Sequence, residues 1–196
     1  MNVLGITGPL GSGKSTLAKR LQKKGCVWIH VDREAQVFYR PDSPLYPRIK
    51  SLFGTTQRAR IREQVFNDSK KLSALNQLIH PALKKRIADQ LKIYKQKKID
   101  CVIIDAAVLY EIGLDRYCDH VVALWAKPAV LIERAVSKGW TPALAKKVIR
   151  AQKSKRFLME HADAVLDSSP PSRVRGTFPL RSAERGKYKE TEFINY

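Results

Sequence analysis

Eight consecutive residues near the start of the chain have the types and spacing needed to hold a chain of phosphates. Residues 8–15 (GPLGSGKS) match the pattern G-x-x-x-x-G-K-[ST], in which glycines let backbone amides approach an anion closely. Those amides and the amino end of a following helix would form a nest for phosphate oxygens. The motif therefore predicts a phosphate-binding loop for a nucleoside triphosphate.

The residues of this loop have separate predicted roles. Lys14 places a positive charge on the β- and γ-phosphates, and the hydroxyl of Ser15 can ligate Mg²⁺. The other predicted contacts to the nucleotide come from Gly8, Gly11, Ser12, Gly13 and Thr16. ATP and Mg²⁺ are therefore the expected ligands.

Two carboxylates stand at the ends of apolar runs that are typical of buried strands. Asp32 follows such a run, and Asp105 ends another (DCVIID). Phosphoryl transfer to an alcohol needs a carboxylate that orients the hydroxyl and accepts its proton, and Asp32 is the predicted general base. Asp105 is the predicted carboxylate of the Mg²⁺ site. The structural alternatives are a helix cap for Asp32 and a strand-end turn for Asp105.

Apolar runs that alternate with helical patterns would position these groups. The predicted strands are residues 2–7, 27–31, 100–105, 120–125 and 164–166. Helices are expected after the loop, at 128–136, after a Thr141–Pro142 cap and within 58–98, where a separate helix is predicted to begin at Pro81. This alternation predicts a doubly wound parallel α/β sheet of about five strands.

The pattern also predicts the domain organisation. Residues 1–40 and 99–170 form the expected nucleotide-binding core, and the helical insert 41–98 is expected to bind the acceptor. After a Ser/Pro-rich stretch, residues 171–196 hold six Lys or Arg against three Glu and are predicted to be a weakly ordered basic tail.

Composition narrows the classes of function. The chain has 196 residues, 44% of them hydrophobic, with 37 Lys plus Arg against 18 Asp plus Glu, a formal net charge of +19. This charge favours nucleic acid, acidic membranes or phosphate-rich small molecules, and composition does not choose among them. A run of about 18 apolar residues, which a membrane span needs, is missing from the sequence. The first residues do not resemble a secretory signal.

The cysteines indicate a compartment. Cys26, Cys101 and Cys118 are odd in number, far apart and without metal-ligand spacing. This pattern argues against a disulfide framework and against a structural zinc site. A reducing cytoplasm is therefore the expected location.

Proteins with such a loop include kinases, GTPases, motors and nucleic-acid ATPases. The length leaves little room for a helicase's second motor domain, and the sequence contains no Asn-Lys-x-Asp guanine signature. A helical insert between the second and third predicted strands suits a small-molecule kinase that grips its acceptor there.

Residues 2–167 resemble the dephospho-CoA kinase family. Residues 29–35 (IHVDREA) are similar to its I-D-A-D segment, with Asp32 at the catalytic base. Residues 105–111 (DAAVLYE) are similar to its D-x-P-L-L-F-E motif. Further similar segments are 52–54 (LFG), 58–66 (RARIREQVF), 78–81 (LIHP), 150–152 (RAQ) and 162–167 (ADAVLD).

The resemblance implies MgATP-dependent phosphorylation of the ribose 3′-hydroxyl of dephospho-coenzyme A, the last step of coenzyme A synthesis. It also implies a lid at about 134–152, in which Arg134 and Lys138 bind the nucleotide. The expected partners are ATP and dephospho-CoA, without membrane or nucleic acid, and the expected state is a monomer or weak oligomer. The sequence departs from the family pattern at His30, Ala107, Lys138 and Ser168.

Three other functions stay open at this point. The first is a P-loop kinase of a nucleotide or nucleoside. The second is a basic nucleic-acid-binding ATPase, which would need the charge gathered on one face. The third is a family member that binds ATP but has lost turnover.

Overall fold

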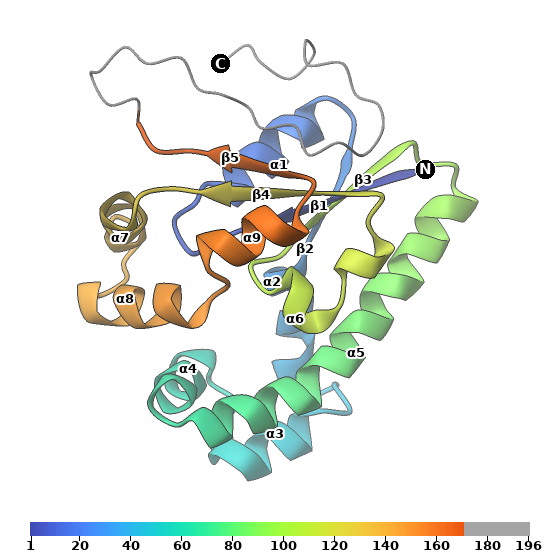
Figure 1. Cartoon of the computed structure of the whole chain (residues 1–196). Coiled ribbons are helices and arrows are strands. Elements are labelled where there is room, and N and C mark those ends of the chain that lie inside the picture. Colours follow the sequence, from blue (N-terminus) through green and yellow to red (C-terminus); the bar gives the residue numbers. More distant parts are fainter. Residues whose placement is uncertain (171–196) are drawn as a thin grey trace.

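Five short apolar segments pair into one sheet in the computed structural model, which describes residues 1–170 (Figure 1). The strands are β1 (Asn2–Thr7), β2 (Val27–His30), β3 (Cys101–Asp105), β4 (His120–Trp125) and β5 (Ala164–Asp167). They are all parallel, in the order β2-β3-β1-β4-β5, so the strand that leads into the phosphate-binding loop is central. The predicted five-stranded parallel sheet is confirmed.

Helices cover both faces of the sheet. On one face, α1 (Lys14–Lys23) buries Ala18 against Ile6, Ile103 and Leu124. The other face carries a larger core that continues into the helical region of the molecule. In Figure 1, α1 lies behind the strands, while α6 (Leu109–Ile112) and α9 (Lys155–His161) lie in front. The arrangement is doubly wound, as predicted.

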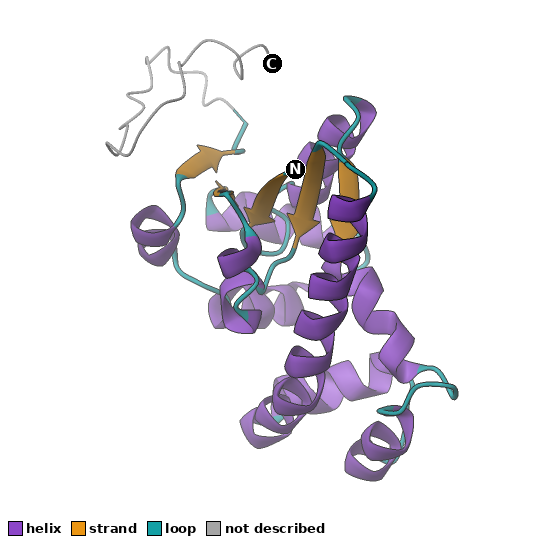
Figure 2. Ribbon diagram, turned by 90° about the vertical axis from the view of Figure 1, so that its right-hand side faces the viewer, coloured by secondary structure: helices purple, strands orange, loops and turns teal. Residues whose placement is uncertain are grey.

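Three longer helices fill the predicted insert. They are α3 (Tyr46–Phe53), α4 (Arg58–Asn67) and α5 (Ser69–Gln96). Figure 2 shows the long helix α5 running beside the sheet and down into the helical region. The apolar stripe on α5 is thus buried at its sheet end against the same core that lines the strands.

The prediction that a separate helix begins at Pro81 is wrong, because Pro81 lies inside α5. A proline in a helix interior removes one backbone hydrogen bond and costs about 3 kcal/mol or more. Here Ile79 and Leu83 are buried on either side of it, and Asp68 caps the helix by accepting bonds from Lys70 N and Lys71 N. Packing on both sides of the proline therefore keeps the helix continuous.

The remaining helices connect the strands. They are α2 (Val31–Glu34), η1 (Ala35–Tyr39), η2 (Asp115–Tyr117), α7 (Pro128–Val136) and α8 (Pro142–Ala151). Thr141 caps α8, since its hydroxyl accepts a bond from Leu144 N at 3.4 Å, and Pro142 lies in the first turn. The capping pattern read from the sequence thus matches the structure.

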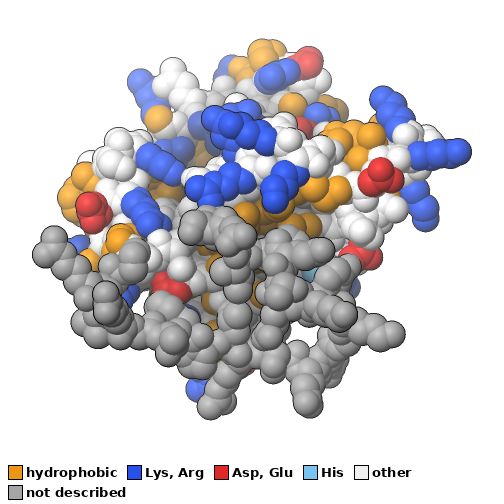
Figure 3. Space-filling view, turned by 90° about the horizontal axis from the view of Figure 1, so that it is seen from above, with side chains coloured by type: hydrophobic (Ala, Val, Ile, Leu, Met, Phe, Trp, Pro, Cys, Tyr) orange, Lys and Arg blue, Asp and Glu red, His pale blue; other side chains and the backbone are white. Residues whose placement is uncertain are grey.

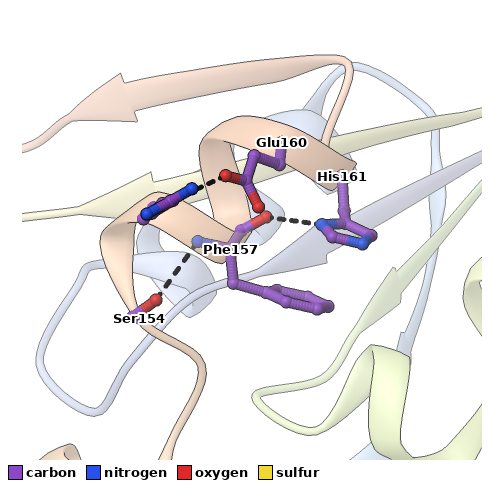
Figure 4. Close-up of polar contacts among 5 residues, drawn as sticks. Ser154, Phe157, Glu160 and His161 are labelled. Atoms are coloured by element: carbon purple, nitrogen blue, oxygen red, sulfur yellow. Dashed lines mark hydrogen bonds and ion pairs between the residues drawn. The ribbon is translucent and has the colours of Figure 1, made fainter.

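Helix α9 joins the end of the predicted lid to the edge strand β5 (Figure 4). The Ser154 hydroxyl accepts a bond from Phe157 N at 3.2 Å and so caps the helix. The rings of Phe157 and His161 are stacked with centroids 3.9 Å apart, and Tyr110 meets both rings edge-on. These contacts fix the chain between the lid and the sheet.

Cys26 and Cys101 form a disulfide, although the cysteine pattern in the sequence argued against a disulfide framework. Their Cα atoms are 4.7 Å apart although 75 positions separate them in the sequence. They become neighbours because β2 and β3 are adjacent and Val27 pairs with Val102. Cys118 is free, and burial, with nearby acidic groups, raises its pKa to about 12.

No helix among residues 1–170 is both long and apolar enough to cross a membrane. The predicted basic tail, 171–196, lies outside the described residues. On the visible part of the face in Figure 3, Lys and Arg side chains outnumber Asp and Glu. The bounds given for the core, insert and lid stay predictions.

Candidate active site

The loop between β1 and α1 has the backbone form that the glycine pattern predicts. Gly8, Gly11 and Gly13 have φ values of +136°, +81° and +92°, which L side chains rarely adopt. A Cβ at Gly8 would overlap the carbonyl oxygen of Leu124, and one at Gly11 would overlap that of Leu131. The loop is therefore packed closely against the end of β4 and against α7.

Lys14 begins α1 and turns its side chain back over the loop. Its Nζ donates to the carbonyl oxygens of Gly8 at 2.8 Å and Pro9 at 3.0 Å. The ammonium group thus lies within the loop, where a bound phosphate would compete with the two carbonyls for it.

Three charged side chains act on the ammonium group of Lys14. Removal from water lowers the pKa of Lys14, while the charges of Asp105 and Asp32 oppose that shift. The charge of Lys138 adds to the lowering. Both predicted carboxylates and the predicted lid lysine therefore lie within electrostatic range of this ammonium group.

Asp105 is buried at the end of β3, with 3% of its surface exposed. Its Oδ2 accepts a bond from the Ser15 hydroxyl at 3.1 Å. Strand register places it beside Ile6 of β1 on one side and His30 of β2 on the other. Burial raises the pKa of Asp105, and the charge of Lys14 is the largest opposing effect.

Ser15 and Asp105 fit the requirements of a shared Mg²⁺ ion. Both offer oxygen, the donor atom that Mg²⁺ prefers, and Mg²⁺ is commonly held by one or two carboxylates together with substrate phosphates. Within residues 1–170, no group of three or more His, Cys, Asp or Glu is placed to hold a metal ion by itself. A cation here would need phosphate oxygens to complete its coordination.

Asp32 lies one strand away from Asp105, in the first turn of α2, and is exposed. It does not cap this helix, since the N-cap position is His30. The helix is tied to α5, because Glu34 Oε2 accepts bonds from Arg86 Nε at 2.6 Å and Gln90 Nε2 at 2.8 Å. The carboxylate of Asp32 is thus exposed on a helix that is held in place.

His30 stands where the resembling family has an aspartate. Its ring stacks on Trp28 with centroids 5.3 Å apart, and its Nδ1 is buried without a partner in the described part of the chain. The charge of His30 lowers the pKa of Asp105. A basic side chain therefore replaces an acidic one beside the predicted Mg²⁺ carboxylate.

Arg134 reaches the outer side of the loop from α7. Its guanidinium group donates to Gly11 O at 3.3 Å, to Ser168 Oγ at 3.0 Å and to Ser168 O at 2.6 Å. The Ser168 hydroxyl in turn donates to Ser12 O at 2.8 Å. Arg134 and Ser168 thus hold the loop by its carbonyl groups. The predicted contact of Arg134 with nucleotide stays a prediction.

The predicted lid also contacts the helical insert. The Arg62 guanidinium lies over the Trp140 ring, 4.8 Å from its centroid. Lys147 Nζ of α8 donates to Asn67 Oδ1 at the end of α4, at 3.1 Å. Helix α8 is therefore connected to α4 in this structure.

One loop contact was missed in the sequence. The amide of Leu10 donates to Gln152 Oε1 at 2.8 Å, across 142 positions. Gln152 belongs to the RAQ segment that carried part of the resemblance, and no role was assigned to it. The RAQ segment was the only feature of the sequence that pointed to Gln152.

The comparisons with known proteins agree with this geometry. A family model described as dephospho-CoA kinase matches residues 2–172. This chain belongs to the dephospho-CoA kinase family. Membership makes it a transferase, as the resemblance implied.

Individual relatives carry the same name. A dephospho-CoA kinase of Leptospira interrogans is 38% identical over 144 residues, covering 69% of this chain and 69% of the relative. One of Chlorobaculum tepidum is 31% identical over 176 residues, covering 84% and 85%. This member of the family therefore spans most of the length of both relatives.

Solved structures support the fold of this family member. A crystal structure of a Thermus thermophilus protein has a TM-score of 0.70 at 24% identity, covering 86% of this chain and 89% of that one. The dephospho-CoA kinase of Campylobacter jejuni has a TM-score of 0.60 at 18% identity, covering 87% and 89%. At these identities the likeness extends to the fold alone.

Proposed function

We propose that this chain transfers the γ-phosphoryl group of ATP to the ribose 3′-hydroxyl of dephospho-CoA, giving coenzyme A and ADP. Membership of the family supports the acceptor. The observation that carries the proposal is the placement of Asp32, whose charge acts on Lys14 of the phosphate-binding loop from the neighbouring helix α2. In this proposal, an anion nest and an exposed carboxylate would serve one reaction centre.

Binding of ATP would rearrange the contacts of Lys14. Its ammonium group donates to the carbonyls of Gly8 and Pro9 and would exchange them for phosphate oxygens. The loop amides and the amino end of α1 add partial positive charge at the same place. Because Lys14 already lies over the loop, these two bonds are the contacts that its ammonium group would exchange when the triphosphate enters.

Asp32 is the proposed general base. It would accept the proton of the 3′-hydroxyl as that oxygen forms a bond to the γ-phosphorus and the bond to the β–γ bridging oxygen breaks. The proton stays on the Asp32 carboxylate, and the electron pair leaves with ADP. The contacts of Glu34 with α5 keep the helix that carries Asp32 in place during this step.

Ser15 and Asp105 would hold Mg²⁺ together with phosphate oxygens. When bound, the cation supplies positive charge that neutralises the charge developing on the β- and γ-phosphates. Lys138, whose charge already reaches Lys14, would add a lid cation at the same phosphates. Arg134 would support the nucleotide chiefly through the loop carbonyls that it binds.

The test is a competition between acceptors. Purified full-length protein receives γ-labelled ATP and Mg²⁺ with an equal mixture of dephospho-CoA, AMP, CMP and nucleosides. Label transferred to dephospho-CoA supports the proposal, and preferential labelling of another acceptor overturns it. ATP turnover that needs RNA or DNA and ignores dephospho-CoA would instead indicate a nucleic-acid-dependent ATPase. Sedimentation of the same sample tests the expected monomer or weak oligomer.

A further inference from the structure

We infer that Gln152 is a positioning residue that couples the lid to the phosphate-binding loop, an inference that rests on the proposed function. Gln152 follows the last residue of α8, and its side-chain oxygen accepts the amide proton of Leu10 at 2.8 Å. Both residues are half-buried. The bond joins the end of the predicted lid directly to the backbone of the loop.

Gln152 holds the loop differently from the two other side chains that bind it from outside. Arg134 and Ser168 donate to the loop carbonyls of Gly11 and Ser12. Gln152 instead accepts from an amide, Leu10 N. Side chains thus bind both carbonyl groups and an amide group of the loop. Of these three side chains, Gln152 is the one that directly follows α8.

The other contacts of α8 link the loop to the helical insert. Lys147 of α8 donates to Asn67, which ends α4 in the helical insert proposed to bind the acceptor. Trp140, just before α8, lies under the Arg62 guanidinium of α4. Helix α8, which is followed by Gln152, therefore also contacts the helical insert that is proposed to bind the acceptor. A displacement of α8 away from α4 would pull Gln152 from Leu10.

This connection makes the loop sensitive to the position of the lid. With α8 in place, the Leu10 amide is bound and the loop keeps the form seen here. With α8 displaced, Leu10 N and the Gln152 side-chain oxygen would both bind water instead. The loop would then lose one of the three side chains that hold it from outside within residues 1–170. Gln152 thereby favours phosphoryl transfer when the lid is closed and water is excluded.

The test variant is Gln152→Leu, which keeps the approximate size of the side chain and removes the acceptor. Gln96→Leu is the matched control, because Gln96 is exposed at the end of α5, away from the loop. One neutral hydrogen bond corresponds to a change of about fivefold to tenfold. We expect kcat/KM for ATP to fall by about that factor in Gln152→Leu.

The decisive readout is the share of ATP that goes to water rather than to the acceptor. A purely structural role would leave this ratio unchanged, whereas loss of lid coupling raises it. We expect the ratio to rise in Gln152→Leu and to stay at the wild-type value in Gln96→Leu, with both variants folded. An unchanged ratio in a folded Gln152→Leu protein would overturn the inference.

A second measurement keeps the inference separate from the proposed function. Amide hydrogen exchange at Leu10 is measured by NMR in wild-type protein and in Gln152→Leu, without acceptor. Faster exchange at Leu10 in the variant supports the contact even if dephospho-CoA proves not to be the acceptor. Equal exchange in the two proteins overturns it, whatever the acceptor is.

Discussion

Aspartates have different uses at the two ends of the parallel strands. The amino edge of the sheet is where the strands begin, and the carboxyl edge is where they end. At the amino edge, Asp119 Oδ2 accepts a bond from Val3 N and Asp163 Oδ2 accepts one from Val121 N, both at 2.7 Å. At the carboxyl edge, Asp32 and Asp105 accept no bond from a backbone amide anywhere in residues 1–170. Asp119 and Asp163 thus join the start of one strand to its neighbour. At the carboxyl edge, Asp32 and Asp105 are the carboxylates proposed to bind ligands, whereas Asp167 at the end of β5 accepts a bond from Ser169 N at 2.8 Å.

The same contrast holds for the other groups at each edge. The disulfide between Cys26 and Cys101 lies at the amino edge, at the start of β2 and β3. The carboxyl edge carries the buried and unpartnered Nδ1 of His30 and the buried hydroxyl of Ser12, which lacks a hydrogen-bond partner among the described residues. Such groups also occur elsewhere in the described residues, at Trp28 Nε1, Gln90 Oε1 and Tyr110 Oη. Unpaired buried polar groups cost free energy, and those of His30 and Ser12 lie where the proposed ligands would pair with them.

The largest expected effect comes from replacing Asp32, the proposed base at the carboxyl edge. Asp32→Asn should lower kcat by about 10²- to 10⁴-fold, because the amide cannot accept the proton of the hydroxyl. ATP affinity and melting temperature should stay near wild type, since Asp32 is exposed. Single-turnover kinetics measures the rate of transfer, and calorimetry measures ATP affinity and melting temperature. Unchanged turnover in this variant would remove Asp32 from its proposed role.

Breaking the disulfide at the amino edge should affect stability alone. Cys26→Ser is expected to lower the free energy of unfolding by up to about 4 kcal/mol, because the loop released in the unfolded chain is long. Denaturant titration measures this loss, and kcat for transfer should be unchanged. Cys118→Ser is the control, since Cys118 is free. A lower kcat in folded Cys26→Ser would show that the two edges are not independent.

Asp119 provides the direct counterpart of Asp32. Asp119→Ala removes the acceptor for Val3 N and should lower the free energy of unfolding by about 1–2 kcal/mol. The carboxylate is exposed, so water replaces part of the lost bond. Thermal melting and steady-state kinetics should show a lower melting temperature with an unchanged KM for ATP. The reverse pattern, stable protein with impaired ATP binding, would contradict the comparison.

The smallest expected effect concerns His80, which lies on α5 away from both edges. Burial lowers the pKa of His80 below its usual value near 6.5. The unfolded chain therefore binds this proton more readily, so stability is full above about pH 6.5 and falls as pH decreases below it. His80→Gln should flatten the dependence of unfolding free energy on pH between about 5 and 7. An identical pH profile in the variant would assign the acid sensitivity to other groups.

Local patterns were sufficient for the strands and for the phosphate-binding loop. The five predicted strands fall within a residue or two of β1 to β5, because short apolar runs bounded by helical patterns have few other solutions in an α/β chain. The glycine pattern also indicated the backbone form of the loop, because only glycine readily adopts the positive φ values seen at Gly8, Gly11 and Gly13. The proximity of Asp105 to Ser15 also followed from the sequence, since the carboxyl ends of parallel strands meet at one edge.

Sequence alone therefore predicted which residues bind phosphate and at which edge of the sheet they gather. Only the tertiary structure decided that Cys26 bonds to Cys101, that α5 continues through Pro81, and that Gln152 holds Leu10. The physical reason is the separation along the sequence of the residues involved. Glycine torsion angles and apolar periodicity depend only on residues that are near one another in the chain. A disulfide, a buried helix face or a bond across 142 positions depends on which distant segments pack together.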